Sequence, residues 1–290
     1  MPTIQTILGP AARQLRAAGS PTPSLDAQLW LAHVCGLSRA QLLAHPERDV
    51  SPEDAARFNE GVARLAAGEP LPYLTGRIDF YGLSFEVTPA TLIPRPETEH
   101  LVDAALDLAR YRKPHSASLR GPWSQIADIG TGSGCIAVSL AVHLPDIRLF
   151  ATDTSPAALE VAARNARRHG VAERITFLQG HLLEPLPGRV DLIVANLPYV
   201  ADDEWDALPV SVREHEPAGA LRGGVRGLDL IDALLAHAPA VLHPKGAIVL
   251  EIGAAQGPAA LALAQARLRG ADVKLRQDFA GRDRLLLIQL

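Results

Sequence analysis

The tetrapeptide Asn-Leu-Pro-Tyr at residues 196–199 brings an amide, a proline and a phenol directly after the mostly apolar run Val190–Ala195. That run is typical of a buried strand. The Asn196 side chain offers a carbonyl acceptor, and the residue before Pro198 is held extended, so that its own backbone carbonyl projects. The ring of Tyr199 supplies a flat stacking face. Two acceptors and an aromatic wall suit a planar NH2 group attached to an sp2 carbon.

A glycine loop forms a second group of interest, because the sequence GTGSG stands between an apolar segment and a helical pattern. Alternating glycines let a ligand approach the backbone closely, and the start of the next helix attracts a carboxylate or phosphate. The following predicted strand, Arg148–Asp153, ends in an acid that can accept both hydroxyls of a ribose. Loop and acid together indicate an adenosine-containing cofactor, the alternative being a structural turn and a surface acid. The expected loop contacts are Gly130, Thr131, Gly132, Ser133 and Gly134.

Together the two groups favour methyl transfer to a conjugated nitrogen. Such a nitrogen is a poor nucleophile: the amide rotation barrier of about 18–20 kcal/mol measures its conjugation, whereas a neutral hydrogen bond contributes only about 0.5–1.5 kcal/mol. Positioning the nitrogen against an electrophilic sulfonium supplies about 7–11 kcal/mol more. S-adenosylmethionine therefore fits better than a hydride carrier. The alternative is that Asn196 only caps a turn, with Pro198 and Tyr199 packed beneath it.

Two residues beside the loop have competing interpretations. Asp128, on the strand before it, either binds the loop's own amides or contacts the ligand directly. Cys135, behind the loop, is interpreted as a small core residue rather than a nucleophile, because no histidine lies nearby in sequence to activate it.

The surrounding pattern predicts the elements that position these groups. Residues 3–68 show helical spacing, and Ser24 and Ser51 are expected to cap two helices. Residues 73–99 predict a hairpin and an extended linker. Five short apolar strands then alternate with helices, one of them at residues 155–170, and the chain ends in a hairpin with an antiparallel strand. This pattern predicts an α/β fold with a mainly parallel sheet.

The expected domains are a helical domain at 1–72, a linker at 73–98 and a cofactor-binding domain at 99–290, with a break in composition at LRGP, residues 119–122. The net charge of −4 does not favour a general nucleic-acid binder. Two cysteines, 35 and 135, without ligand spacing argue against disulfides or a metal site and favour the cytoplasm. No convincing membrane span is present.

These motifs resemble the HemK/PrmC type of class I methyltransferase, the release factor glutamine N5-methyltransferases. The resemblance covers nearly the whole chain and includes "LIPRPETE" at 92–99, "DIGTGSGCIA" at 128–137, "NLPY", "HEPAGALRGGVRGLDL" at 215–230, "EIGAAQG" and "DFAGRDR". It implies a seven-stranded Rossmann-like sheet with S-adenosylmethionine as cofactor and S-adenosylhomocysteine as product. It also implies that the substrate is the glutamine of the Gly-Gly-Gln motif in class I peptide chain release factors.

The resemblance further implies roles for individual residues. The glutamine amide donates its hydrogens to the Asn196 side chain and the Leu197 carbonyl, with Pro198 and Tyr199 completing the catalytic and substrate-binding set. Asn196 also borders the cofactor. The motif contains no general base, so proton loss to water is expected.

Two positions depart from the family's pattern. Leu197 replaces the usual proline, so the loop loses a fixed φ angle and gains an N–H. His181 stands where relatives usually carry an acid, so a carboxylate contact to the adenine amino group is missing, although His181 and Leu182 are still expected to line the adenine pocket. The resemblance implies that "LIPRPETE" lies over the cofactor end of the site. The alternative is that this segment is only a proline-stiffened linker in which Arg95 pairs with a nearby acid.

Other functions remain open at this stage. An adenine-N6 methyltransferase of DNA or RNA would use the same tetrapeptide, but would need a basic face. A ribosomal-protein glutamine methyltransferase would differ mainly in the helical domain, and a non-catalytic partner-binding module would bind cofactor without turnover. We expect a monomer with a docking domain for the release factor, no metal and no membrane association.

Overall fold

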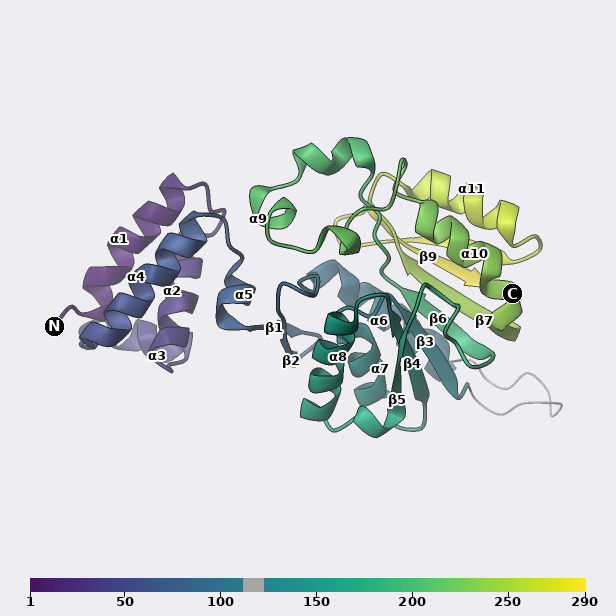
Figure 1. The fold of residues 1–290 in the computed structure, drawn as a ribbon, viewed down its shortest axis with the longest axis horizontal. Coiled ribbons are helices and arrows are strands. Elements are labelled where there is room, and N and C mark those ends of the chain that lie inside the picture. Colours follow the sequence, from purple (N-terminus) through teal and green to yellow (C-terminus); the bar gives the residue numbers. More distant parts are fainter. Residues whose placement is uncertain (112–122) are drawn as a thin grey trace. The chain divides into compact units, whose positions relative to one another are not determined.

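The computed structural model describes residues 1–111 and 123–290, and these form two compact units (Figure 1). The first comprises Met1–Arg77 and Pro209–His215, and the second comprises Ile78–Leu208 and Glu216–Leu290. The predicted break at residues 119–122 lies outside the described residues. No helix in the described part of the chain is both long and apolar enough to cross a membrane.

The first unit is helical, as predicted. Ser51 caps α4, because its hydroxyl accepts from Asp54 N at 3.0 Å. The expected cap at Ser24 is wrong: Pro23 occupies the first helical position, so the helix already begins there and Thr22 precedes it. The Trp30 indole packs on Gly61, where an added Cβ would lie 2.1 Å from the ring. The helices are α1 Ile4–Ala17, α2 Pro23–Val34, α3 Arg39–Ala44, α4 Pro52–Ala66, α5 Leu71–Thr75 and α9 Val210–Arg213.

The second unit begins with the predicted hairpin region and linker. Strands β1 Arg77–Phe80 and β2 Leu83–Glu86 pair in a two-stranded sheet, and the chain then runs extended to the short 3-10 helix η1 Pro96–Thr98. Phe80 and Phe85 pack edge to face, with ring centroids 6.0 Å apart. Both rings are buried, so this small sheet is anchored on the core of the second unit.

The main sheet confirms the predicted α/β class. Its seven strands lie in the order β5-β4-β3-β6-β7-β9-β8, and only β9 runs antiparallel to its two neighbours. The strands are β3 Gln125–Ile129, β4 Arg148–Asp153, β5 Ile175–Gln179, β6 Val190–Ala195, β7 Leu242–Glu251, β8 Asp272–Gln277 and β9 Asp283–Gln289.

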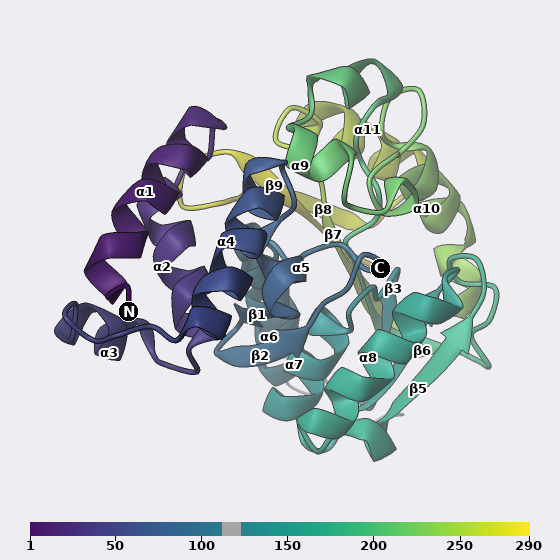
Figure 2. The same cartoon turned by 60° about the vertical axis from the view of Figure 1, so that its left-hand side comes forward.

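Helices cover both faces of this sheet (Figures 1 and 2). Residues of α6, α7 and α8 pack into the core on one face, and residues of α10 and α11 into the core on the other. These helices are α6 Glu99–Tyr111, α7 Cys135–His143, α8 Pro156–Arg168, α10 Asp229–Val241 and α11 Gly257–Arg267. Short 3-10 turns occur at η2 Ala172–Arg174, η3 Asp202–Ala207 and η4 Ala218–Ala220.

Helix α8 shows how closely local sequence sets an element's limits. Ser155 accepts a hydrogen bond from Ala158 N at 3.2 Å, and Pro156 occupies the first position. Gly170 follows the helix with φ of +68°, a conformation that glycine adopts without steric cost. The helix therefore returns the chain from β4 to β5 as predicted.

Candidate active site

The site lies at the carboxyl ends of β3, β4 and β6. In the strand order β4-β3-β6, loops leaving parallel strands meet at one edge of the sheet, which is where α/β folds bind ligands. A cavity of about 230 Å³ opens there, all of it within the second unit. The predicted site residues that line it are Gly130, Thr131, Gly132, Ser133, Asp153, His181, Leu182, Asn196, Leu197 and Pro198.

The glycine loop has the left-handed geometry that its sequence requires. Gly130, Gly132 and Gly134 have φ of +73°, +56° and +79°. At Gly132 an added Cβ would meet no atom within 4 Å, so the backbone there is open. At Gly134 a Cβ would lie 3.0 Å from Ala162 on α8, and Gly134 does not line the cavity. One glycine therefore leaves room for a ligand and another allows close helix packing.

Asp153 holds the loop and the next helix together. Its Oδ2 accepts from Gly132 N and its Oδ1 from Ser155 N, both at 2.9 Å. Each carboxylate oxygen can accept a second bond, so the side chain can still take ribose hydroxyls. Asp153 thus has a structural role that the sequence did not reveal, and its ribose contact stays a prediction.

Asp128 is fully buried beneath the loop. Its Oδ2 accepts from the Thr131 hydroxyl at 2.7 Å and from Ala137 N at 3.1 Å, and burial raises its pKa to about 7. Asp128 does not line the cavity, which favours the structural interpretation over ligand contact. Burial likewise raises the pKa of the Cys135 thiol to about 12, which fits an unreactive core residue.

Some residues of the tetrapeptide line the cavity, and others pack against neighbouring parts of the second unit. Asn196 Nδ2 donates to Thr98 Oγ1 at 3.1 Å, while its carbonyl oxygen bonds no described residue and remains an acceptor. Leu197 is 3% exposed, and its side chain would lie 3.3 Å from a Cβ added at Gly130, so it packs on the glycine loop. Tyr199 does not line the cavity; its hydroxyl donates to Glu251 at 3.4 Å. The stacking role of Tyr199 therefore stays a prediction.

The residues that support the tetrapeptide come from two motifs whose chemistry the sequence alone did not explain. Gly223 N donates to Val200 O at 2.8 Å, and Gln256 Nε2 donates to Tyr199 O at 2.8 Å. A Cβ at Gly223 would lie 2.6 Å from the Pro198 carbonyl oxygen. The glycines of "RGGVRG" and the glutamine of "EIGAAQG" thus fix the backbone after β6.

Gly227 gives a direct test of this support. It has φ of +68°, and an added Cβ would lie 2.1 Å from Tyr199 O. We expect Gly227→Ala to lower kcat at least about tenfold, because strain and collision of about 1–3 kcal/mol must move the site backbone. Gly270→Ala is the matched control, with φ of +87° and open space. Steady-state methyl-transfer rates compare them, and equal loss in both variants would refute a specific role for Gly227.

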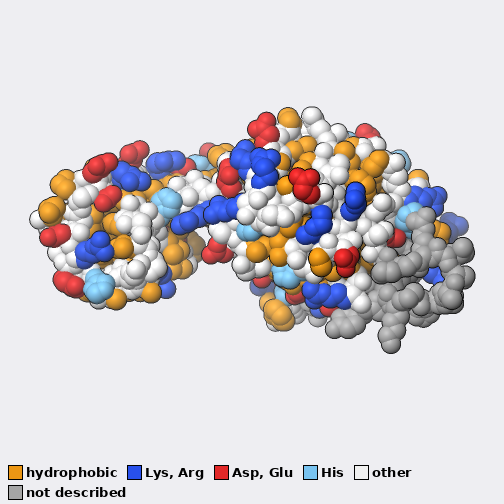
Figure 3. Space-filling model, turned by 90° about the horizontal axis from the view of Figure 1, so that it is seen from below, with side chains coloured by type: hydrophobic (Ala, Val, Ile, Leu, Met, Phe, Trp, Pro, Cys, Tyr) orange, Lys and Arg blue, Asp and Glu red, His pale blue; other side chains and the backbone are white. Residues whose placement is uncertain are grey.

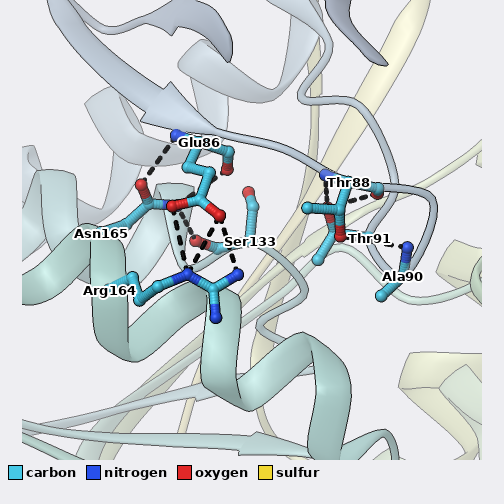
Figure 4. Close-up of polar contacts among 7 residues, drawn as sticks. All are labelled: Glu86, Thr88, Ala90, Thr91, Ser133, Arg164 and Asn165. Atoms are coloured by element: carbon cyan, nitrogen blue, oxygen red, sulfur yellow. Dashed lines mark hydrogen bonds and ion pairs between the residues drawn. The ribbon is translucent and has the colours of Figure 1, made fainter. Parts of the chain in front are cut away.

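A buried asparagine ties the hairpin region to the glycine loop (Figure 4). Asn165 on α8 accepts from Glu86 N at 2.7 Å and donates to Glu86 O at 3.0 Å and to Ser133 O at 2.9 Å. Arg164 also pairs with the Glu86 carboxylate. On the far side of the same segment, Thr91 Oγ1 donates to Thr88 O at 3.2 Å and turns the chain toward the cavity.

The "LIPRPETE" segment is tied to "HEPAGAL" by Glu216. Its carboxylate, 1% exposed, pairs with Arg95 and accepts from Ile93 N at 3.1 Å. The alternative of an Arg95 ion pair is therefore correct, and Arg95 also lines the cavity. The linker is thus both a structural tie and part of the wall.

The fold and the cavity define a class I methyltransferase. A family model described as a methyltransferase small domain matches residues 117–211, and another described as the PrmC N-terminal domain matches residues 6–76. A solved methyltransferase from Pyrococcus furiosus has the same fold, with a TM-score of 0.52 and 18% identity over 80% of this chain and 98% of that one.

Sequence relatives identify the family within that class. The chain is 46% identical to the release factor glutamine methyltransferase of Moorella thermoacetica over 98% of each chain. It is 41% identical to the protein of that name from Nitratidesulfovibrio vulgaris over 98% of this chain and 94% of the other. The chain belongs to the release factor glutamine methyltransferases.

Proposed function

We propose that this protein transfers a methyl group from S-adenosylmethionine to the side-chain nitrogen of the glutamine in the Gly-Gly-Gln motif of class I release factors. The observation that carries the proposal is the carbonyl oxygen of Asn196, which bonds no described residue and lies in the same cavity as the glycine loop and Asp153. Family membership supports the choice of glutamine as acceptor.

The residues present fit the cofactor. The open backbone at Gly132 is a cradle that a Cβ would fill, and Asp153 retains acceptor capacity for ribose hydroxyls. His181 and Leu182 also line the cavity, and we assign them to the adenine pocket. When bound, S-adenosylmethionine supplies a methyl group on an electrophilic sulfonium.

The chain's own residues orient the acceptor. Asn196 Oδ1 and the Leu197 carbonyl accept the two amide hydrogens and hold the nitrogen lone pair toward the donor. Both acceptors interact more strongly as the nitrogen becomes pyramidal and positive, which favours the transition state over the ground state. The excess proton leaves to water, because the tetrapeptide supplies no base.

The alternatives find less support. An adenine-N6 methyltransferase is expected to carry a basic surface that binds nucleic acid. Here the net charge is −4, and acidic and basic side chains are interspersed on the face seen in Figure 3. A non-catalytic module would not need the free Asn196 acceptor. Substrate choice between a release factor and a ribosomal protein depends on docking, which we assign to the helical first unit. We further propose a cytoplasmic monomer that needs no metal.

The experiment is methyl transfer from labelled cofactor. Purified release factor, its Gln→Ala variant in Gly-Gly-Gln, ribosomal proteins, and adenine-containing DNA and RNA are offered in parallel. Label on the wild-type factor alone is the expected result. Label on nucleic acid or a ribosomal protein moves the function to that substrate, and cofactor binding without label on any of them supports the non-catalytic module.

A further inference from the structure

Glu251, the last residue of β7, is a buried acid without a role in the chemistry above. It is 1% exposed. The residue before it, Leu250, pairs with Ala195 at the end of the neighbouring strand β6. The Tyr199 hydroxyl donates to its Oε1 at 3.4 Å, while Oε2 accepts no hydrogen bond from a described residue. A carboxylate removed from water and incompletely bonded is costly, so its place next to the tetrapeptide calls for an explanation.

Thr98 connects this acid to Asn196. It is 2% exposed, and its Oγ1 accepts from Asn196 Nδ2 at 3.1 Å. The same hydroxyl interacts with Glu251 and lowers the pKa of that carboxyl group. A threonine hydroxyl has one proton and two lone pairs. If the proton is directed to the carboxylate, only lone pairs remain for Asn196, which must then turn its NH2 toward Thr98.

We propose that Glu251 and Thr98 are positioning residues that fix the orientation of the Asn196 amide, so that its carbonyl oxygen faces the substrate nitrogen. The inference rests on the proposed function and extends it to residues outside the tetrapeptide. The nitrogen and oxygen of an asparagine amide have nearly the same shape, so packing alone does not select one orientation. A reversed amide would present a donor to the substrate NH2 group and oppose its binding.

The ionisation state of Glu251 determines whether the NH2 group or the carbonyl oxygen of Asn196 faces Thr98. Burial is the largest influence and raises its pKa; with the smaller lowering by Thr98, Arg284 and Tyr199 and the raising by Glu97 included, the pKa of Glu251 is raised to about 7. Above pH 7 the carboxylate accepts the Thr98 proton and the amide is fixed. As the pH falls through 7, the protonated acid can donate to Thr98, whose own proton is then free for Asn196 Oδ1. We expect kcat to fall on the acid side of pH 7.

The test compares Thr98→Val, Thr98→Ser and Glu251→Gln with wild type. Thr98→Val should lower kcat about tenfold, the loss of roughly one hydrogen bond, while Thr98→Ser stays within about twofold. Glu251→Gln should remove the acid limb of the kcat–pH profile. Cofactor affinity measured by calorimetry should be unchanged in all three. Thr176→Val, on the exposed side of β5, is the control for a threonine-to-valine change.

Equal kcat values in Thr98→Val and Thr98→Ser, or an acid limb that persists in Glu251→Gln, would overturn the proposal. A separate readout does not depend on the substrate: in 15N-labelled protein, the Asn196 NH2 protons should be protected from exchange in wild type and Thr98→Ser and unprotected in Thr98→Val. Protection that is the same in all three also overturns it. An inactive wild type with this protection pattern would refute the proposed function alone.

Discussion

Replacing Asn196 by alanine is expected to lower kcat by about 10²–10³-fold, the size found when one preorganised transition-state hydrogen bond is lost. The structure explains why the effect should fall on kcat. Asn196 Oδ1 is an acceptor without a described partner, and Nδ2 is held by Thr98 at 3.1 Å. In the proposed function, its carbonyl is therefore preorganised to accept from the substrate amide.

The measurement separates turnover from cofactor binding. In Asn196→Ala we expect the Kd for S-adenosylmethionine to rise no more than about tenfold, because at most one neutral hydrogen bond is lost there. Asn165→Ala is an instructive control: it removes a buried amide that contacts Ser133 and Glu86, and so should affect stability and cofactor binding first. A kcat in Asn196→Ala within threefold of wild type would contradict the assigned role.

Replacing Asp153 by alanine is expected to weaken cofactor binding by about two orders of magnitude. Two effects add: the ribose hydroxyls lose a charged acceptor, and the backbone N–H groups of Gly132 and Ser155 lose theirs. Hydrogen bonds to a charged group contribute about 1.5–3 kcal/mol each, so loss of one or two accounts for the change. Calorimetric titration with S-adenosylmethionine and with S-adenosylhomocysteine measures it.

Two further variants show which effect dominates. Asp153→Asn keeps one carbonyl oxygen, so it should retain part of the loop support and lose the charge. Asp146→Ala removes an exposed acid at the other end of β4 and should leave the Kd unchanged. A Kd for Asp153→Ala within fivefold of wild type would contradict a ribose contact.

The sequence predicted the parts of the site that depend on local chemistry. Each of three features has a pattern that can be read within a few residues: the glycines at positive φ, the strand that ends in Asp153, and the strand that Asn196 follows. The parallel order of β4, β3 and β6 follows from the alternation of strands and helices, and it brings these ends together. Fold class and the cavity's main lining residues were therefore predictable.

Residues that support the site were not predictable in this way. Gln256 donates to Tyr199 across 57 positions of sequence, and Glu216 bonds the linker across more than a hundred. No local pattern distinguishes such a glutamine or glutamate from an exposed one. Tyr199 shows the same limit: no local pattern predicts that its hydroxyl contacts Glu251, 52 positions away.

The bond between Asn196 and Thr98 joins residues 98 positions apart, and that between Gln256 and Tyr199 reaches nearly to the last helix of the chain. A growing polypeptide therefore cannot complete these contacts until Gln256 has left the ribosome. Since a ligand that binds only the finished pocket stabilises the native state by RT ln(1 + [L]/Kd), cofactor must act on the second unit as a whole. Bound cofactor is therefore expected to stabilise the second unit against unfolding.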